Sequence, residues 1–312
     1  MACKDAGGKG RAGVRPEWIA VDWGTSNLRV WAMGPDGILA QAESDDGMGR
    51  LGRDAFEAAL LALIAPWLGA GVTPVIACGM VGSRQGWQEA SYRAVPCTPL
   101  DRAGLLRVQV KDARIAVYIA PGLMQAKPAD VMRGEETQIA GALALHPAFD
   151  GVICLPGTHS KWAQVSAGEV VSFQTYMTGE LFALLSGHSV LRHGMAGEGW
   201  DDDAFDAGLS DALSRPDRIG ARLFNLRAEG LLAGLSAECA RARLSGLLIG
   251  VELAAAKPYW LGQPVTLIGA EALCRNYARA LSMQGVEARL LPATECTLAG
   301  LASLAHTLEA TP

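Results

Sequence analysis

The sequence predicts an α/β protein built from two related half-domains. The main observation is a short signature that occurs twice, first as Ile19–Arg29 and again as Val152–Trp162. In each copy an apolar strand leads into a Gly-Thr turn with small polar residues, and a second strand follows. Strand-like and helix-like segments also alternate through the rest of the chain, which is typical of α/β proteins. The repeated signature indicates two domains of the same kind.

Composition sets the broad class of the protein. The chain has 312 residues, of which 50% are hydrophobic and 19% charged, so we expect a globular protein large enough for two domains. The net charge of −5 argues against a nucleic-acid partner, which usually needs a basic face. An anionic small substrate is still allowed, because local cations and backbone dipoles can hold one. No apolar run approaches about 20 residues without a charge or a turn, so we expect no membrane partner.

The start of the chain and the cysteines indicate the compartment. Residues 1–17 are an expected flexible tail, since they are rich in Gly, Lys and Arg and lack the apolar stretch of a signal peptide. The 7 cysteines include no Cys-x-x-Cys pair and are odd in number, which favours free thiols in a reducing cytosol. We therefore expect a cytoplasmic protein.

The first half-domain is expected over residues 18–150. It opens with a strand pair over 18–33, a Gly-Pro-Asp-Gly turn and a third strand, which is the pattern of an antiparallel meander. Apolar residues at helical spacing then predict a helix over 53–68. The later elements are strands at 73–78 and 114–120 and a helix at 135–145. This order of elements is typical of one half of an actin-like or sugar-kinase fold.

The second half-domain is expected over residues 151–312 and begins again with a strand pair at Val152. The expected helices span 178–192, 202–213, 219–233, 235–256, 271–283 and 297–308, and the expected strands span 265–268 and 287–291. We therefore expect two actin-like (ribonuclease H-like) domains with a nucleotide cleft between them. Closure is expected about the connection near residues 296–300.

The two Gly-Thr turns are candidate phosphate-binding sites. Glycine lets backbone N–H groups approach an anion closely, and threonine or serine hydroxyls add donors. Two such turns in related half-domains suggest that both grip one polyphosphate. The candidate residues are Gly24, Thr25, Ser26 and Asn27 in the first turn, and Gly157, Thr158, His159, Ser160 and Lys161 in the second.

Asp22 is the candidate metal residue. It follows three apolar residues and precedes the first Gly-Thr turn, where a carboxylate could hold Mg²⁺ through water close to the phosphates. A structural alternative is that Asp22 caps the turn. Leu155 stands where the acid would repeat in the second copy, so only the first turn carries a carboxylate. This asymmetry suits one metal ion and one nucleotide.

Three carboxylates are candidates for a general base that accepts the proton of an attacking hydroxyl. Glu135 and Glu136 stand at the start of a helix rich in small residues, and Asp130 lies shortly before them. The helix dipole also favours acids at this position, so a purely structural role is an alternative. Glu135 is preferred, and Asp130 and Glu136 remain open.

Two further segments are candidate ligand sites. Gly269 and Ala270 form a small-residue turn through which adenine or ribose could approach the backbone, although tight strand–helix packing explains the same pattern. Ser83 and Arg84 stand in a Gly-rich loop and could bind a sugar acid, because arginine pairs bidentately with a carboxylate. Trp87 offers an apolar face to the sugar, and the alternative is a surface loop with one core tryptophan.

Several of these segments together resemble the 2-dehydro-3-deoxygalactonokinase family, a branch of the sugar kinase, Hsp70 and actin superfamily. The resemblance runs from about Trp18 to the C-terminus. The matching segments are Val21–Arg29, Gly79–Ser83, Met132–Gln138, Leu155–Trp162 and Thr178–Phe182. It implies ATP-dependent phosphorylation of the C6 hydroxyl of a sugar acid, 2-dehydro-3-deoxygalactonate, in bacterial galactonate breakdown. ATP and Mg²⁺ are the implied cofactors.

Our hypothesis for the mechanism assigns roles to individual residues. The turn at 24–27 would contact the terminal phosphates of ATP, and the turn at 157–160 the inner ones. Arg133 would be another partner for the substrate carboxylate, and Glu135 would orient the C6 hydroxyl. Many kinases of the superfamily carry aspartate as the base, whereas this chain offers two adjacent glutamates.

Two other functions fit the same predicted fold. One is a kinase for a different sugar or sugar acid, such as the gluconate-derived epimer of the same substrate. The other is an actin-like ATP-binding regulator that binds nucleotide without acceptor-dependent release of ADP. The retained acids and both Gly-Thr turns argue against the regulator. A homodimer is allowed by the apolar content of the chain.

Overall fold

The computed structural model describes residues 13–309, and the chain divides into two units. The first unit contains the described residues up to Phe149, with Gly168–Val170 and the segment from Thr294 onward. The second unit contains Asp150–Ala167 and Val171–Ala293. Most of the expected N-terminal tail lies outside the described residues. In the part of the chain that is described, no helix is long and apolar enough to cross a membrane.

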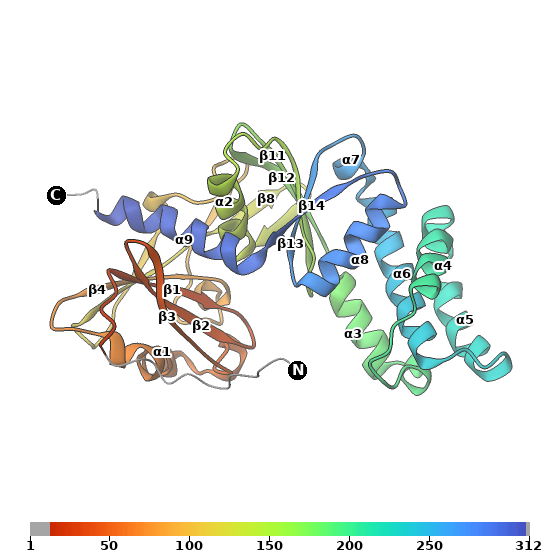
Figure 1. Ribbon diagram of the computed structural model, residues 1–312, viewed down its shortest axis with the longest axis horizontal. Helices are drawn as coiled ribbons and strands as arrows, with labels where there is room; N and C mark the ends of the chain where they lie inside the picture. The colour runs from red at the N-terminus through yellow and green to blue at the C-terminus, as the bar shows by residue number, and fades with distance from the viewer. Residues whose placement is uncertain (1–12, 310–312) are drawn as a thin grey trace. The chain divides into compact units, whose positions relative to one another are not determined.

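The first unit is built on a six-stranded sheet with the order β3-β2-β1-β4-β7-β6 (Figure 1). Its strands are β1 (Trp18–Trp23), β2 (Leu28–Gly34), β3 (Gly37–Ser44), β4 (Thr73–Cys78), β6 (Leu106–Val108) and β7 (Ile115–Ile119). β1 pairs with β2 in antiparallel register and with β4 in parallel register. The predicted meander and the predicted strands at 73–78 and 114–120 are confirmed.

Three helices accompany this sheet: α1 (Phe56–Ile64), α2 (Glu135–Leu145) and α9 (Ala293–Glu309). The helix expected over 53–68 is shorter, because its two ends are 3-10 turns and Pro66 lies in the second of them, where it cannot donate a backbone hydrogen bond. A second, three-stranded sheet was not predicted. Its strands are β5 (Tyr92–Ala94), β8 (Gly122–Ala126) and β9 (Ala129–Met132), in the order β5-β8-β9.

β1 is buried on both faces. Its side chains point alternately to the two faces of the sheet, and all of them except Asp22 are apolar. Ile19, Val21 and Trp23 belong to the core that includes the buried face of α1. Trp18 and Ala20 belong to a second core, to which α9 contributes. The central sheet of the first unit is therefore packed by α1 on one face and by α9 on the other.

α9 joins the first unit through very close contact with α2. A methyl group added at Gly141 would lie 1.7 Å from the Cys296 carbonyl oxygen, and one added at Gly300 would lie 2.1 Å from the Thr137 carbonyl oxygen. Only glycine permits this approach of the two helices. We expected residues 151–312 to form one domain; the division of the chain instead groups α9 with the first unit.

The second unit repeats the strand pattern in a five-stranded sheet, β12-β11-β10-β13-β14. Its strands are β10 (Gly151–Leu155), β11 (Ser160–Ser166), β12 (Glu169–Tyr176), β13 (Val265–Gly269) and β14 (Ala288–Pro292). β10 pairs with β11 in antiparallel register and with β13 in parallel register, just as β1 pairs with β2 and β4. The two copies of the sequence signature therefore form equivalent strand pairs.

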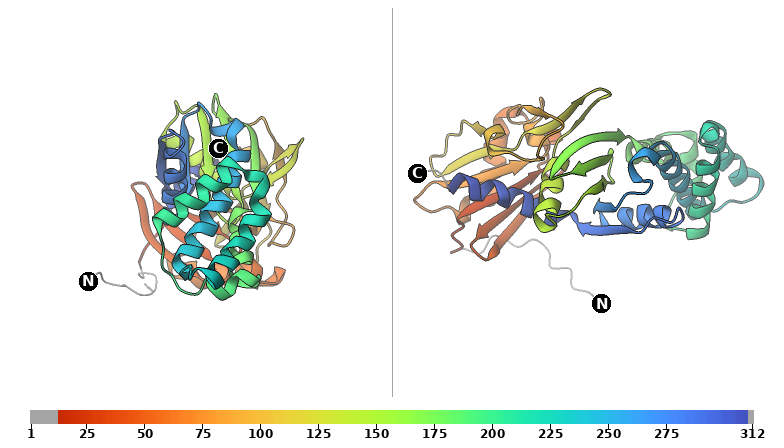
Figure 2. Two further views of the ribbon diagram at one scale, coloured as in Figure 1. Left: turned by 90° about the vertical axis from the view of Figure 1, so that its right-hand side faces the viewer. Right: turned by 90° about the horizontal axis from the view of Figure 1, so that it is seen from above.

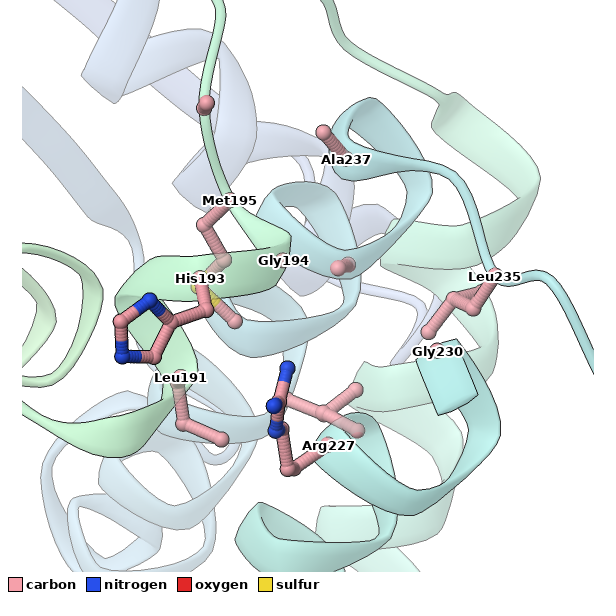
Figure 3. Close-up of a pocket in the computed structure, with 11 residues that line it drawn as sticks. Leu191, His193, Gly194, Met195, Arg227, Gly230, Leu235 and Ala237 are labelled. Atoms are coloured by element: carbon pink, nitrogen blue, oxygen red, sulfur yellow. The ribbon is translucent and has the colours of Figure 1, made fainter. Parts of the chain in front are cut away.

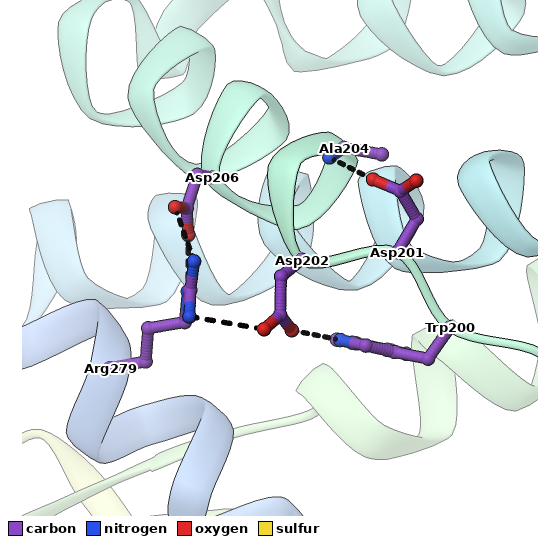
Figure 4. Close-up of polar contacts among 6 residues, drawn as sticks. All are labelled: Trp200, Asp201, Asp202, Ala204, Asp206 and Arg279. Atoms are coloured by element: carbon purple, nitrogen blue, oxygen red, sulfur yellow. Dashed lines mark hydrogen bonds and ion pairs between the residues drawn. The ribbon is translucent and has the colours of Figure 1, made fainter.

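Helices make up most of the rest of this unit, and α4, α5 and α6 lie side by side (Figure 2). The helices are α3 (Thr178–His188), α4 (Asp202–Ser214), α5 (Ile219–Leu232), α6 (Ala237–Ala255), α7 (Lys257–Trp260) and α8 (Glu271–Ser282). Arg279 on α8 binds both carboxylate oxygens of Asp206 on α4, at 2.6 and 2.7 Å, and also reaches Asp202 at 3.2 Å (Figure 4). This ion pair ties α8 to α4.

Candidate active site

The first Gly-Thr turn joins β1 to β2 and is held by a neighbouring loop. The N–H groups of Met48 and Gly49 donate to the carbonyl oxygens of Gly24 and Thr25, each at 2.9 Å. A methyl group added at Gly47 would lie 2.2 Å from a backbone carbon of the turn. The exposed side chains of the turn are those of Thr25, Ser26 and Asn27. The turn is therefore fixed from behind and presents polar groups outward.

Asp22 lies at the end of β1 and forms an ion pair with Arg29 on β2, with Arg29 Nη2 donating to Asp22 Oδ2 at 2.5 Å. Burial raises the pKa of Asp22, Arg29 opposes that rise, and the Glu135 carboxylate adds to it. Asp22 and Glu135 are thus close enough for their charges to interact. The equivalent position in the second unit is Leu155, which is buried and carries no charge.

Two glycines allow the start of α2 to approach the end of β1. Gly79 follows β4 with a φ of +91°, and Gly134 precedes α2 with a φ of +106°, both in the region that favours glycine. A methyl group added at Gly134 would lie 3.3 Å from Gly79 Cα, and one added at Gly79 would lie 2.7 Å from the Trp23 carbonyl oxygen. These contacts bring Glu135 toward Asp22.

Glu136 differs in burial from the other two candidate bases, Glu135 and Asp130. Glu135 is half-buried and accepts a backbone N–H at 3.0 Å. Glu136 is fully buried and accepts a backbone N–H at 2.6 Å; burial and the charge of Glu135 raise its pKa to about 8. Asp130 lies on β9 and accepts the N–H of its neighbour at 2.8 Å. Partial exposure and proximity to Asp22 favour Glu135 as the base, whereas full burial disfavours Glu136.

Arg133 is a buried cation with unused donors. Its Nη2 donates to the Ala90 carbonyl oxygen at 2.7 Å, and its guanidinium lies 4.3 Å from the centre of the Tyr92 ring. Within residues 13–309 its Nε and Nη1 have no hydrogen-bond partner, and the same holds for the buried Ser83 hydroxyl. A methyl group added at Gly82 would lie 2.9 Å from Arg133 Nη1, so Arg133 lies directly beside the Ser83 loop. Buried donors without a partner suit an anionic ligand.

The other two candidate substrate residues lie differently. Arg84 is exposed and forms a long ion pair with Glu89 at 3.6 Å. The ring of Trp87 lies 6.1 Å from the rings of both Trp23 and Phe56, and it packs against the core of the first unit. Trp87 thus has the packing role that was its alternative. Contact of Arg84 or Trp87 with a substrate stays a prediction.

The second Gly-Thr turn joins β10 to β11 and is braced by the start of α3. The Glu180 N–H donates to the Thr158 carbonyl oxygen at 2.9 Å. A methyl group added at Gly179 would lie 2.3 Å from the Gly157 carbonyl oxygen. The exposed ring of His159 pairs through Nε2 with Glu180 Oε2 at 2.6 Å. Backbone and side-chain contacts with α3 therefore fix this turn.

The last two residues predicted for this turn point away from solvent. Ser160 and Lys161 are both buried at the start of β11, and the Ser160 hydroxyl lies 2.9 Å from the Tyr277 hydroxyl. Their burial could not be read from the sequence, where they continue a run of polar residues.

Gly269 ends β13, and Ala270 precedes α8. A methyl group added at Gly269 would lie 2.9 Å from the Pro156 carbonyl oxygen and 3.2 Å from Cys274 Sγ. Tight packing, the alternative considered from the sequence, therefore accounts for Gly269. Ala270 is exposed, and a contact of either residue with a nucleoside stays a prediction.

The described residues contain no cluster of potential metal ligands. Among residues 13–309, no group of three or more His, Cys, Asp or Glu side chains could hold a metal ion. Asp22 with its partly buried carboxylate is compatible with Mg²⁺, which commonly takes one or two carboxylates together with water and substrate phosphates.

The helical part of the second unit contains a pocket of about 260 Å³ (Figure 3). It is lined by α5, the start of α6 and the 3-10 turn at Val190–Gly194, and it includes His193 and Arg227. None of the predicted site residues lines it. The pocket is therefore a separate feature from the Gly-Thr turn.

Comparison with known proteins identifies relatives of the whole chain. A family model described as 2-keto-3-deoxy-galactonokinase matches residues 22–304. The probable 2-dehydro-3-deoxygalactonokinase of Rhizobium meliloti (strain 1021) is 40% identical over 302 residues, covering 93% of this chain and 97% of the relative. The 2-dehydro-3-deoxygalactonokinase of Escherichia coli (strain K12) is 37% identical over 292 residues, with the same coverage of 93% and 97%.

A solved structure agrees with these sequence relatives. A crystal structure of a Sinorhizobium meliloti protein, described as a 2-dehydro-3-deoxygalactonokinase, has a TM-score of 0.88 at 38% identity. It covers 94% of this chain and is itself covered to 100%. Together with the repeated strand pairs and their Gly-Thr turns, these findings define an ATP-dependent kinase of the actin-like fold.

The chain belongs to the 2-keto-3-deoxy-galactonokinase family. The predicted family, fold and enzyme class, a 2-dehydro-3-deoxygalactonokinase of galactonate catabolism, are confirmed. The individual site residues remain predictions.

Proposed function

We propose that this protein transfers the terminal phosphate of MgATP to the C6 hydroxyl of 2-dehydro-3-deoxygalactonate in the cytosol. The named relatives support the substrate, and free thiols support a reducing compartment. The observation that carries the proposal is that the Nε and Nη1 of Arg133 and the hydroxyl of Ser83 are buried and have no hydrogen-bond partner within residues 13–309. A guanidinium beside a hydroxyl is well suited to the carboxylate of a sugar acid.

The nucleotide is held by backbone groups of both Gly-Thr turns. Residues 24–27 contact the terminal phosphates and residues 157–160 the inner ones, with Gly269 and Ala270 bordering the nucleoside. Asp22 would hold Mg²⁺, and the ion would supply positive charge to neutralise the phosphates. Because the turns are braced by their own units, their N–H groups need little reorganisation when the phosphates bind.

Glu135 accepts the proton of the C6 hydroxyl as that oxygen attacks the terminal phosphorus. Its half-buried position and its proximity to Asp22 support this role. With its pKa at about 8, Glu136 is mostly protonated at neutral pH and adds little negative charge beside the phosphates. Catalysis then depends mainly on positioning and charge stabilisation.

The test is coupled release of ADP from MgATP with three acceptor conditions. These are 2-dehydro-3-deoxygalactonate, its gluconate epimer and no acceptor. Release of ADP with the galactonate acid alone supports the proposal. Release with both acids would instead indicate a sugar-acid kinase with a broader substrate specificity. Nucleotide binding without acceptor-dependent release would instead indicate the non-catalytic regulator.

Arg133→Met tests the carboxylate contact directly. We expect the KM for the sugar acid to rise at least about tenfold, since a charge-assisted hydrogen bond is lost, while the KM for ATP stays within about twofold. Arg107→Met is the matched control, because Arg107 is an exposed arginine on β6 of the same unit and is not a predicted site residue. Equal changes in both KM values for Arg133→Met would point to general damage and contradict the assignment.

A further inference from the structure

A carboxylate that the proposed mechanism does not use is buried in the second unit. Glu252 on α6 is 2% exposed. It accepts hydrogen bonds from Trp162 Nε1 and from the Tyr277 hydroxyl, each at 2.7 Å, and from the Thr178 hydroxyl. Burial raises its pKa, and these donors oppose the rise. Three structural elements, β11, α3 and α8, thus converge on one side chain of a fourth.

The partners of Glu252 lead to both flanks of the second Gly-Thr turn. Tyr277 also lies 2.9 Å from the hydroxyl of Ser160, the residue with which β11 begins just after the turn. Thr178 begins α3, and two residues further on the Glu180 N–H holds the Thr158 carbonyl oxygen at 2.9 Å. One flank of the turn is therefore connected to Glu252 through Tyr277, and the other is connected to Glu252 through Thr178 at the start of α3.

The number of available protons limits the directions of these hydrogen bonds. A tyrosine hydroxyl has one proton, and Tyr277 donates it to Glu252. The hydroxyl of Ser160 can then donate to the Tyr277 oxygen at 2.9 Å or to Glu252, with which it also forms a hydrogen bond. The Ser160 proton is consequently used inside the protein, and this fully buried hydroxyl holds the turn in place.

Stability alone gives a weak reason for an acid at this position. Burying a carboxylate is costly, and apolar residues of similar volume often stabilise a fold equally well or better. A carboxylate does, however, impose directional contacts on each donor around it, which fixes their relative positions. The elements fixed in this way are those that flank the turn.

We propose that Glu252 is a positioning residue that holds the Gly157–Thr158 turn in its phosphate-binding conformation, acting through Tyr277 and Thr178. This rests on the proposed function, in which the turn binds the phosphates of ATP. The sugar-acid residues Ser83 and Arg133 belong to the other unit, so loss of this network should act on the nucleotide selectively.

The test removes the Tyr277 and Thr178 hydroxyls, which connect Glu252 to the two flanks of the turn, one at a time. Replacing Glu252 itself would leave three buried donors without an acceptor and would threaten the fold. Tyr277→Phe and Thr178→Val each remove one hydroxyl with little change in shape. Tyr176→Phe is the matched control, because its hydroxyl is also buried and close enough to Glu252 to be influenced by its charge, yet makes no hydrogen bond within the described residues.

The readouts are the KM for ATP, the KM for the sugar acid, kcat, and the Kd of MgADP measured directly by calorimetry. For Tyr277→Phe and Thr178→Val we expect the KM for ATP and the Kd of MgADP to rise by about three- to tenfold. The KM for the sugar acid should stay within about twofold, and the double variant should exceed either single one. Tyr176→Phe should leave all four values within about twofold.

Two outcomes would overturn the proposal. One is unchanged nucleotide affinity in folded Tyr277→Phe and Thr178→Val, and the other is a parallel rise of both KM values, which a merely structural role would produce. Failure of the proposed function has a different signature: the wild-type protein would bind MgADP without turning over the sugar acid, or would not bind it. In the first case the calorimetric comparison still tests Glu252.

Discussion

The two Gly-Thr turns join equivalent strands but have different surroundings. The first is braced by the loop at 47–49 and lies between the two residues of an ion pair, Asp22 on β1 and Arg29 on β2. The second is braced by α3, follows the apolar Leu155, and is connected to a carboxylate that is wholly internal, Glu252. The repeat thus preserves the strand–turn–strand geometry, while the residue before the turn is charged in the first unit and apolar in the second.

The largest expected difference is between substitutions at Asp22 and at Leu155, the equivalent residues that precede the two turns. Asp22→Asn keeps the shape and the contact with Arg29 but loses the charge that attracts Mg²⁺, so kcat should fall by at least about a hundredfold. Leu155→Met, a volume-conserving change at the equivalent position, should leave kcat within about threefold. Both are measured by coupled ADP release at saturating substrates. Comparable losses of kcat in the two variants would contradict the proposed difference between the two strand ends.

The next largest expected difference in kcat is between substitutions of two adjacent carboxylates of the first unit. Glu135→Gln removes the proposed base, and kcat should fall by about a hundredfold. Glu136→Gln resembles the protonated form that its pKa of about 8 maintains at neutral pH, so kcat should stay within about threefold. Single-turnover measurements of phosphate transfer check both variants. A larger loss for Glu136→Gln would exchange the two roles.

A third experiment asks whether both turns need their braces. Gly47→Ala and Gly179→Ala place a methyl group 2.2 and 2.3 Å from backbone atoms of the first and second turn, respectively. Each should raise the KM for ATP by about tenfold, since the turn must shift. Gly52→Ala and Gly187→Ala, where an added methyl group meets nothing within 4 Å, are the controls. An effect at only one turn would show that only that turn contacts nucleotide.

The smallest effect concerns pH. The pKa of Glu136 is about 8 in the folded protein against an ordinary value of 4.5. Between these values the folded chain keeps a proton that the unfolded chain has released, so this group lowers stability as pH rises from about 4.5 to about 8. Relative to wild type, Glu136→Gln should therefore gain stability over that interval, by a few kcal/mol at most. Urea unfolding at several pH values measures the difference, and parallel profiles would contradict the prediction.

The sequence predicted the features that depend on short, contiguous sequence motifs. The repeated strand–Gly-Thr–strand pattern predicted the equivalent pairs β1–β2 and β10–β11, and the strings around the turns predicted the family. It was less informative about α9, because the contact of Gly141 with Cys296 joins residues far apart in the chain. The three-stranded sheet was missed because its strands are short and mostly only partly buried.

Burial was the main property of the candidate site that the sequence did not reveal. Ser160 and Glu136 are polar residues within polar strings, yet both are fully buried. The sequence does not single out Tyr92 or Glu252, since their contacts with Arg133 and Trp162 span tens of residues. The only local hint of Glu252 was an acid within a helix otherwise rich in small and apolar residues.

The position of α9 also governs when the first unit can be completed during synthesis. Leu301 and Leu304 share a buried core with Trp18 and Trp31, and they leave the ribosome only after the whole second unit. At elongation rates of about 5–20 residues per second, the roughly 150 intervening residues take about 8 to 30 seconds. The nascent first unit exposes that apolar face throughout, which makes it a natural client for chaperones that bind hydrophobic surface on emerging chains.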